Sequence, residues 1–186
     1  MKATDILSSE HRVIEDVLYA VETAAERAKA GEHQSPEFFL KAAEFISGFA
    51  DGCHHRKEEG VLFKMLTDHG MPTMGSPVGV MLQEHAMARD YTQAMREAAE
   101  QWEAGDISAR VICAENALDY VALLRQHILK EDQILFPMAG NIIPQTEWHL
   151  VEEGFEHVEH EETGEGIHEK YLAIAEDLRH AALSPA

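Results

Sequence analysis

Four histidines and two glutamates occur in two copies of one pattern along the chain. Each copy has a single histidine and, 43 or 42 residues later, a second histidine that precedes a glutamate by four positions. The residues are His11, His54 and Glu58 in the first copy, and His85, His127 and Glu131 in the second. Glutamate also precedes the single histidine in both copies, and an apolar-Leu-Phe segment follows both glutamates. These matches indicate a weak internal duplication.

The spacing of four residues puts each histidine and its glutamate on the same face of a helix, one turn apart. In both copies that face is otherwise apolar, and an unpaired carboxylate in an apolar core costs several kcal/mol. A divalent cation removes this cost by coordination. Mixed imidazole and carboxylate ligation suits iron, manganese or zinc better than calcium or magnesium. Six protein ligands exceed the need of one tetrahedral zinc, so two ions that share bridging carboxylates account for the set.

A single histidine on an apolar face is more often a core residue than a ligand, and only the duplicated set argues for metal.

The second helix offers two registers for the motif, because His55 and Glu59 have the same spacing as His54 and Glu58. Aligning the apolar residues after each motif favours His54 and Glu58, and His55 would be rotated about 100° away on an α-helix. Glu59 and Asp132 are then expected to accept hydrogen bonds from imidazole N–H groups.

Helical periodicity recurs in four stretches that would position these residues. Loops rich in glycine and proline separate the stretches, and Ser35-Pro36-Glu37 is a typical helix start. The stretches cover approximately residues 5–30, 36–69, 77–104 and 108–139. Long amphipathic segments with short connections predict an all-α, antiparallel bundle. Residues 1–140 would form this domain, and residues 141–186 would form a C-terminal helical extension packing on it.

Composition limits the function further. Apolar residues make up 45% of the 186 residues and the net charge is −19, which disfavours nucleic acid and anionic membranes as partners. The sequence shows neither a long apolar span nor a secretion signal, so a cytoplasmic monomer or homodimer is expected. Cys53 and Cys113 are expected to be buried free thiols.

The motifs closely resemble those of the hemerythrin-like family, also described as the HHE cation-binding domain, over roughly residues 4 to 139. The resemblance rests on Glu10-His11, His54-x-x-x-Glu58, Glu84-His85 and His127-x-x-x-Glu131-Asp132-Gln-Ile-Leu-Phe-Pro137. It implies an up-down four-helix bundle with two non-haem irons, with zinc or manganese as possible substitutes. It also implies that the four histidines are terminal ligands and that Glu58 and Glu131 bridge the ions.

The chain departs from the oxygen-carrying hemerythrins at the third helix, where they have two histidines one turn apart. Met81 and Arg89 occupy the positions four residues from His85. One metal would then lack a ligand, which favours reaction with small molecules over reversible oxygen carriage. A tail residue could supply the ligand, and the candidates are Glu161, His168 and Tyr171. A capping helix that leaves the metal untouched is the favoured interpretation of the tail, and Tyr120 is expected to border the metal pocket.

Three functions remain open from the sequence. The first is a di-iron protein that binds or reacts with O2, H2O2 or NO in stress response or sensing. The second is a non-enzymatic metal-binding or iron-sensing module, and the third is a structural helical bundle. The sequence does not decide whether the protein is an enzyme.

Overall fold

The computed structural model describes residues 3–164 and 166–183, together with all their side chains except those of 161–163 and 183. Every regular element in this part of the chain is a helix, which confirms the expected all-α class. Among these helices we find none that is long and apolar enough to cross a membrane.

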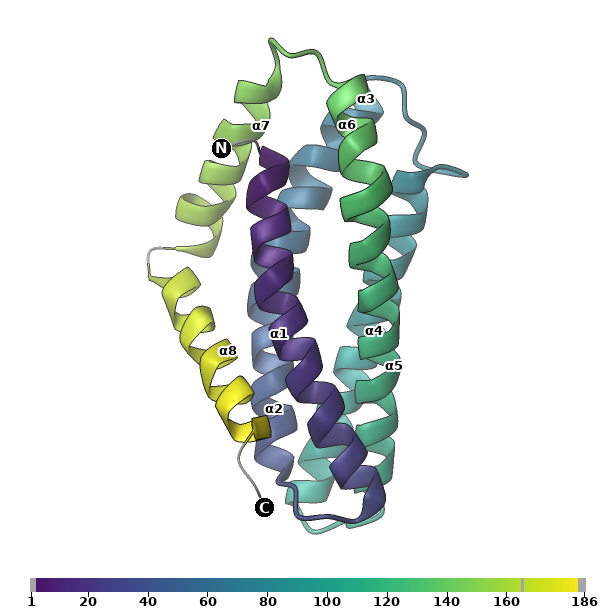
Figure 1. The fold of residues 1–186 in the computed structure, drawn as a ribbon, viewed down its shortest axis with the longest axis vertical. Helices are drawn as coiled ribbons and strands as arrows, with labels where there is room; N and C mark the ends of the chain where they lie inside the picture. The colour runs from purple at the N-terminus through teal and green to yellow at the C-terminus, as the bar shows by residue number, and fades with distance from the viewer. Residues whose placement is uncertain (1–2, 165, 184–186) are drawn as a thin grey trace.

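Four long helical runs form the body of the molecule. The first and third are the single helices α1 (Ala3–Ala30) and α4 (Pro77–Glu103). The second consists of α2 (Pro36–Phe45), η1 (Ile46–His55), η2 (Glu58–Leu62) and α3 (Phe63–Asp68). The fourth consists of α5 (Ala109–Lys130), η3 (Glu131–Leu135) and α6 (Phe136–Ile142). Successive runs point in opposite directions, and α5 packs against both α1 and α4 (Figure 1).

The helix starts follow from local chemistry. The side chain of Ser35 accepts a hydrogen bond from the Glu37 backbone N–H at 3.2 Å, and Pro36 occupies the first turn. Ser76 caps α4 in the same way, accepting from the Gly79 N–H at 3.3 Å. Each cap satisfies one of the backbone donors that a helix start leaves free. The helix start predicted at Ser35-Pro36 is therefore confirmed.

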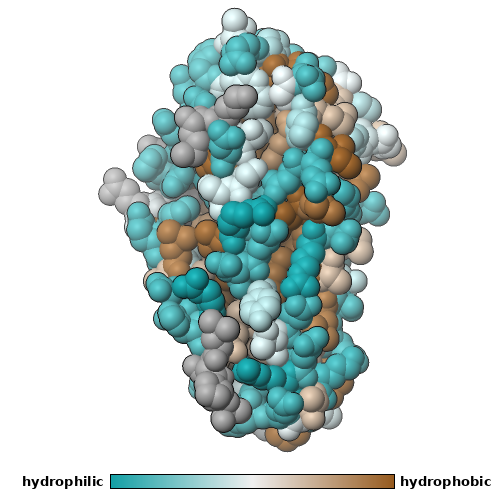
Figure 2. Space-filling model, viewed as in Figure 1, coloured by the Kyte–Doolittle hydropathy of each residue, from teal (hydrophilic) through white to brown (hydrophobic). Residues whose placement is uncertain are grey.

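Buried apolar side chains form two clusters along the four runs. The larger contains Ile14, Ala50, Ala88 and Leu124, and the smaller contains Leu7, Leu62, Met81 and Leu135. On every run the histidines and glutamates of the duplicated motif lie between residues of the two clusters. The core is therefore divided by a polar layer. On the face in Figure 2, hydrophilic side chains cover most of the surface, with hydrophobic atoms between them.

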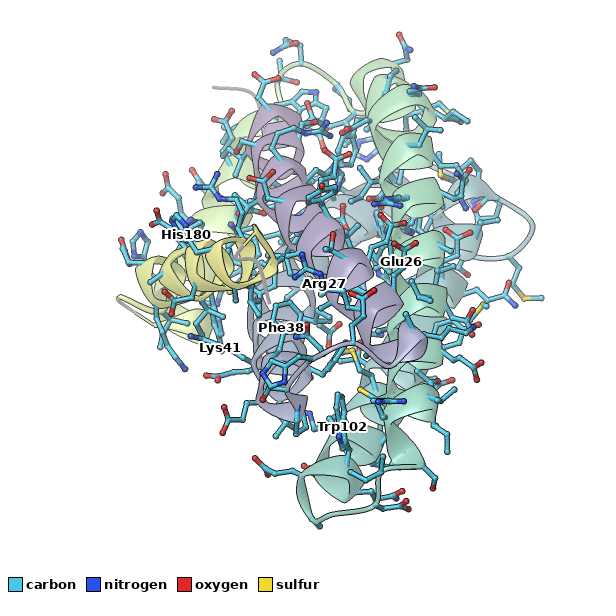
Figure 3. All side chains as sticks on the ribbon, turned by 60° about the horizontal axis from the view of Figure 1, so that its bottom comes forward. Glu26, Arg27, Phe38, Lys41, Trp102 and His180 are labelled. Carbon is cyan, nitrogen blue, oxygen red and sulfur yellow. The ribbon has the colours of Figure 1, made fainter. Side chains whose placement is uncertain are left out.

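The C-terminal segment lies along one side of the four runs as a bent helical arm (Figure 1). It consists of α7 (Trp148–His157), η4 (Val158–Thr163) and α8 (Ile167–Leu183). Helix α8 packs on α1 and α2 and buries Ile174 and Leu178 in the larger cluster. Lys41 of α2 pairs with Asp177 at 2.5 Å, and Figure 3 shows Lys41 near the yellow helix that bears His180.

The two cysteines are free and buried, as predicted. The Cys53 thiol donates to the Gly48 carbonyl oxygen at 3.2 Å. Burial raises the pKa of Cys113 to about 12, so its thiol is protonated at neutral pH. Both therefore act as small buried side chains.

Candidate metal centre

The polar layer contains two adjoining groups of metal-ligating side chains. His11, His54, Glu58 and Glu131 each offer an atom, and these atoms all lie within 4.8 Å of one another. His55, Glu58, His85 and His127 form a second group by the same measure. All seven residues of the two groups are buried. The structure thus brings together all six sequence-predicted residues and adds His55.

The two carboxylates stand between the groups. Glu58 directs Oε1 toward His54 Nε2 and Oε2 toward His85 Nε2, at 3.4 Å in both cases. Glu131 Oε2 lies 3.2 Å from His11 Nε2 and 3.3 Å from His127 Nε2. Each carboxylate therefore faces one histidine from each group. This is the arrangement that a carboxylate bridge between two ions requires.

Carboxylates also surround the centre from outside, and each of the five imidazoles has its Nδ1 beside one. For the four histidines of the duplicated motif these contacts measure 2.8–3.0 Å. The pairs are His11 with Asp132, His54 with Glu10, His85 with Glu59, and His127 with Glu84. His55 Nδ1 lies 3.3 Å from Asp51 Oδ1. The hydrogen bonds expected of Glu59 and Asp132 are confirmed.

This outer ring determines what the imidazoles present to the centre. A carboxylate can only accept, so each Nδ1 carries the proton and donates it. In the neutral imidazole, Nε2 then presents a lone pair to the interior. His85 Nε2 and His127 Nε2 face each other at 3.0 Å, where two lone pairs repel unless a cation or a proton lies between them. The ring therefore sets the tautomer and orientation typical of metal-ligating histidines.

The inner carboxylates show that the residues present fit a metal. Both oxygens of Glu58 and both oxygens of Glu131 are buried and lack a hydrogen-bond partner among the described residues, as does His11 Nε2. Buried polar atoms are nearly always hydrogen-bonded, because leaving one unpaired is costly. Four unpaired carboxylate oxygens that face imidazole lone pairs make a donor set for cations.

Without metal, protons would compensate this charge. Burial alone would lower the pKa of His54, but the Glu58 and Glu10 carboxylates outweigh it and raise the pKa to about 10. Burial also opposes protonation of His127, whose pKa Glu131 nevertheless raises to about 9. His55 behaves differently, because burial and the neighbouring His85 lower its pKa to about 3. His55 is therefore neutral and offers its Nε2 lone pair at any physiological pH.

Helix geometry explains why His54 and His55 both reach the centre. They end η1, a π-helical segment, and Glu58 and Glu131 each begin another, η2 and η3. A π-helix bonds residue i to i+5, so each turn holds more residues and successive side chains diverge less than on an α-helix. The assumption of a regular α-helix, on which the sequence-based choice against His55 rested, therefore does not hold in this segment. Asp51, one turn before His55, is the sequence signal that could have identified it.

Two of the three tail residues considered as ligands, His168 and Tyr171, lie elsewhere. The His168 ring is 5.4 Å from that of Phe49, and Tyr171 lies over Gly48. Neither belongs to the two groups, whereas His55 belongs to the second. The side chain of Glu161 lies outside the described residues. Tyr120 lines a pocket together with His55, in agreement with its expected place beside the centre.

Comparison with known proteins agrees with the geometry. An uncharacterized protein of Mycobacterium tuberculosis and one of Mycobacterium bovis are each 26% identical to the chain over 163 residues. The match covers 88% of this chain and 63% of each relative, so the chain spans less than two thirds of their length. No solved structure matches. The model of the family "Hemerythrin HHE cation binding domain" matches residues 2–139, and the chain therefore belongs to this family.

Proposed function

We propose that the protein is a non-haem di-iron protein that binds or reacts with a small oxidant, O2, H2O2 or NO, in stress response or sensing. The observation that supports it most strongly is the pair of buried carboxylates, Glu58 and Glu131, with four unpaired oxygens between two sets of imidazoles. In this proposal the four helical runs are the up-down four-helix bundle of the family.

The donor set supports two ions rather than one. Five imidazoles and two carboxylates are more than a single ion can bind, and each carboxylate faces histidines of both groups. His11 and His54 would be terminal ligands of one ion, and His55, His85 and His127 of the other. Glu58 and Glu131 would bridge them. Imidazole with carboxylate suits iron, while zinc and manganese remain alternatives that metal analysis distinguishes.

The protein's own groups would prepare the site for a small ligand. Two bound irons would supply electrons to an oxidant and Lewis acidity at open positions. The outer carboxylates hold each ring in place through Nδ1. Phe136 stacks on His11 at 5.6 Å and Phe63 on His85 at 5.8 Å between ring centroids, and these rings exclude water from that side. A dry site with fixed donors favours small, uncharged or weakly solvated reactants.

The test is metal content and visible absorption of protein loaded with Fe(II) without air and then exposed to air. The proposal predicts about two irons per chain and new near-ultraviolet absorption of ferric iron on oxidation. Less than one iron per chain, or zinc alone with no spectral change, would contradict it. Peroxide consumption by the loaded protein then separates a reactive centre from a non-enzymatic metal-binding module.

A further inference from the structure

A pocket of about 250 Å³ lies between η1, α4 and α5 and reaches the candidate metal centre at His55. Its walls include Ser47, Asp51, Thr92, Arg96 and Tyr120. Because the site is duplicated, a second pocket would be expected at the equivalent place between α1 and α5. The side chains there differ, and the differences show what the first pocket can bind.

Side-chain size explains the pocket on the α4 side. Aligning His85 with His11 pairs Ala88 with Ile14 and Thr92 with Leu18. Ala88 and Thr92 line the pocket, whereas Ile14 and Leu18 are buried in the larger apolar cluster. The smaller side chains on α4 leave space that the larger ones on α1 fill.

The facing wall differs in polarity. Aligning His54 with His127 pairs Asp51 with Leu124 and His55 with Ile128. Leu124 and Ile128 are buried among apolar side chains, whereas Asp51 and His55 line the pocket. One side of the molecule is thus closed by aliphatic packing, and the other is open and polar.

Tyr120 is the polar group of this pocket that has no assigned role. It is fully buried, and its Oη has no hydrogen-bond partner in the described chain. Burial raises the pKa of Tyr120, so the phenol keeps its proton and is available as a donor. A buried hydroxyl without a partner destabilises the fold, so its hydrogen bond is expected to go to a bound molecule.

The charges around the pocket favour an anion. Arg89 pairs with two carboxylates at the edge of the pocket, with Nε 2.7 Å from Asp51 Oδ1 and Nη2 2.6 Å from Glu59 Oε1. Arg96 donates to a main-chain carbonyl and to Ser47 Oγ, both at 3.0 Å, and both acceptors are neutral. The residue equivalent to Arg96 on α1 is Glu22. In a chain with a net charge of −19, an arginine at this pocket marks a local preference for negative ligands.

We propose that this pocket binds a small inorganic anion beside the His55 face of the centre, with the Tyr120 hydroxyl donating a hydrogen bond to it and Arg96 balancing its charge. The inference deepens the proposed function, because His55 is taken there as a metal-facing residue. The pocket has room for an anion of two to four heavy atoms, such as azide or nitrite, and the buried Tyr120 hydroxyl would be its donor.

The experiment is a calorimetric titration with azide of the full chain, both metal-free and iron-loaded, comparing wild type with Tyr120→Phe. Loss of a hydrogen bond to a charged ligand is expected to weaken azide binding by about tenfold. The iron content should not change, because Tyr120 lies in neither ligand group. The melting temperature without azide should not fall, because the hydroxyl has no partner among the described side chains, whereas loss of a structural hydrogen bond would lower it.

A second variant tests the space itself. Thr92→Leu places a larger side chain in the pocket and should weaken azide binding at least severalfold. Ser47→Leu, at an exposed position on the same wall, repeats the test if Thr92→Leu folds poorly. Gly140→Leu is the matched control. It lines a separate cleft of about 490 Å³ between α1, α6 and α7, and its new side chain meets no atom within 4 Å at Cβ. It should leave azide binding unchanged.

The outcomes separate the two proposals. Equal azide affinity in wild type and Tyr120→Phe, with unchanged azide binding in Thr92→Leu and Ser47→Leu, would overturn the pocket assignment. The iron content of the wild type would still test the metal centre separately. A chain that binds no iron but loses azide binding in Tyr120→Phe would support the pocket and contradict the proposed di-iron function. Weaker azide binding in Gly140→Leu alone would place the anion site in the other cleft and overturn the inference.

Discussion

The two halves of the duplicated site share their outer contacts and differ in their inner ones. In each half the glutamate before the single histidine accepts from the second histidine, as Glu10 does from His54 and Glu84 from His127. A lysine three residues after that second histidine then donates to the same glutamate, from Lys57 and from Lys130. The first half adds His55, where the second half has Ile128.

This difference makes the centre asymmetric, with two histidines in one group and three in the other. The outer ring is repeated because every imidazole needs a fixed tautomer, whichever group it joins. The inner difference also affects the pocket, because His55 and its partner Asp51 both line it. The symmetric and asymmetric features therefore have different roles: the outer carboxylates hold the imidazoles in place, and the additional histidine would distinguish two bound ions.

The largest effect is expected from the two inner carboxylates: Glu58 belongs to both groups, and Glu131 of the first group also faces His127 of the second. Replacing Glu58 or Glu131 with Gln keeps the shape but removes the negative charge, and both ions lose a ligand. We expect each variant to retain half of the wild-type iron or less, by metal analysis after anaerobic loading. Because both carboxylates face both groups, the two losses should be similar. Full iron occupancy in either variant would rule out its bridging role.

Replacing His55 with Ile gives the first half the residue of the second and should affect one ion only. The three-histidine group loses a ligand, so iron content should fall from about two toward one per chain. The fold should persist, because Asp51 keeps its ion pair with Arg89. Ile128→Val is the matched control at the equivalent position and should retain both ions. Unchanged iron content in His55→Ile would show that His55 is a core histidine.

The paired lysines should differ in their effect on stability. Lys57 is 1% exposed and donates to Glu10 at 2.5 Å and to Glu159 of η4 at 3.2 Å. Lys57→Met leaves a buried carboxylate partly unpaired and should cost about 2–4 kcal/mol of unfolding free energy. Lys130 is about one-third exposed, and Lys130→Met should cost less than about 1 kcal/mol. Urea unfolding of the metal-free proteins measures the loss of unfolding free energy in each variant. Equal losses in Lys57→Met and Lys130→Met would contradict the prediction.

The smallest effect concerns the contact between α8 and the first half. A Cβ at Gly48 would lie 1.9 Å from the end of the Tyr171 ring, so the ring must move in Gly48→Ala. The better helix propensity of alanine offsets part of the cost of moving the ring, so the free energy of unfolding should change by no more than about 1 kcal/mol. Proteolysis of the C-terminal arm should become faster. Gly60→Ala is the control, because a Cβ there meets nothing within 4 Å. It should stabilise the protein by about 0.5–1 kcal/mol.

Much of this arrangement could be predicted from the sequence because it depends on spacing. The period of the apolar residues gave four helical stretches, and the structure has helical runs at nearly the same bounds. The repeated His-x-x-x-Glu spacing identified six residues that the structure brings together. These features depend on contacts within one helix or on matching patterns, which a single sequence contains.

The features that the sequence did not reveal depend on tertiary structure. The position of His55 follows from the π-helical segment η1, whose hydrogen-bond pattern has no clear sequence signature. The roles of Glu10 and Glu84 depend on which histidine of a neighbouring helix faces them. Tyr120 was expected near the centre, but the lack of a partner for its hydroxyl among the described residues depends on tertiary structure.

The most direct test of the asymmetric centre is anomalous X-ray scattering at the iron edge from crystals of the iron-loaded protein. We predict two peaks about 3–4 Å apart, the distance typical of two-metal sites. One should lie among His11, His54 and the two carboxylates, and the other among His55, His85 and His127. A single peak, or two peaks with His55 bound to neither, would contradict the account.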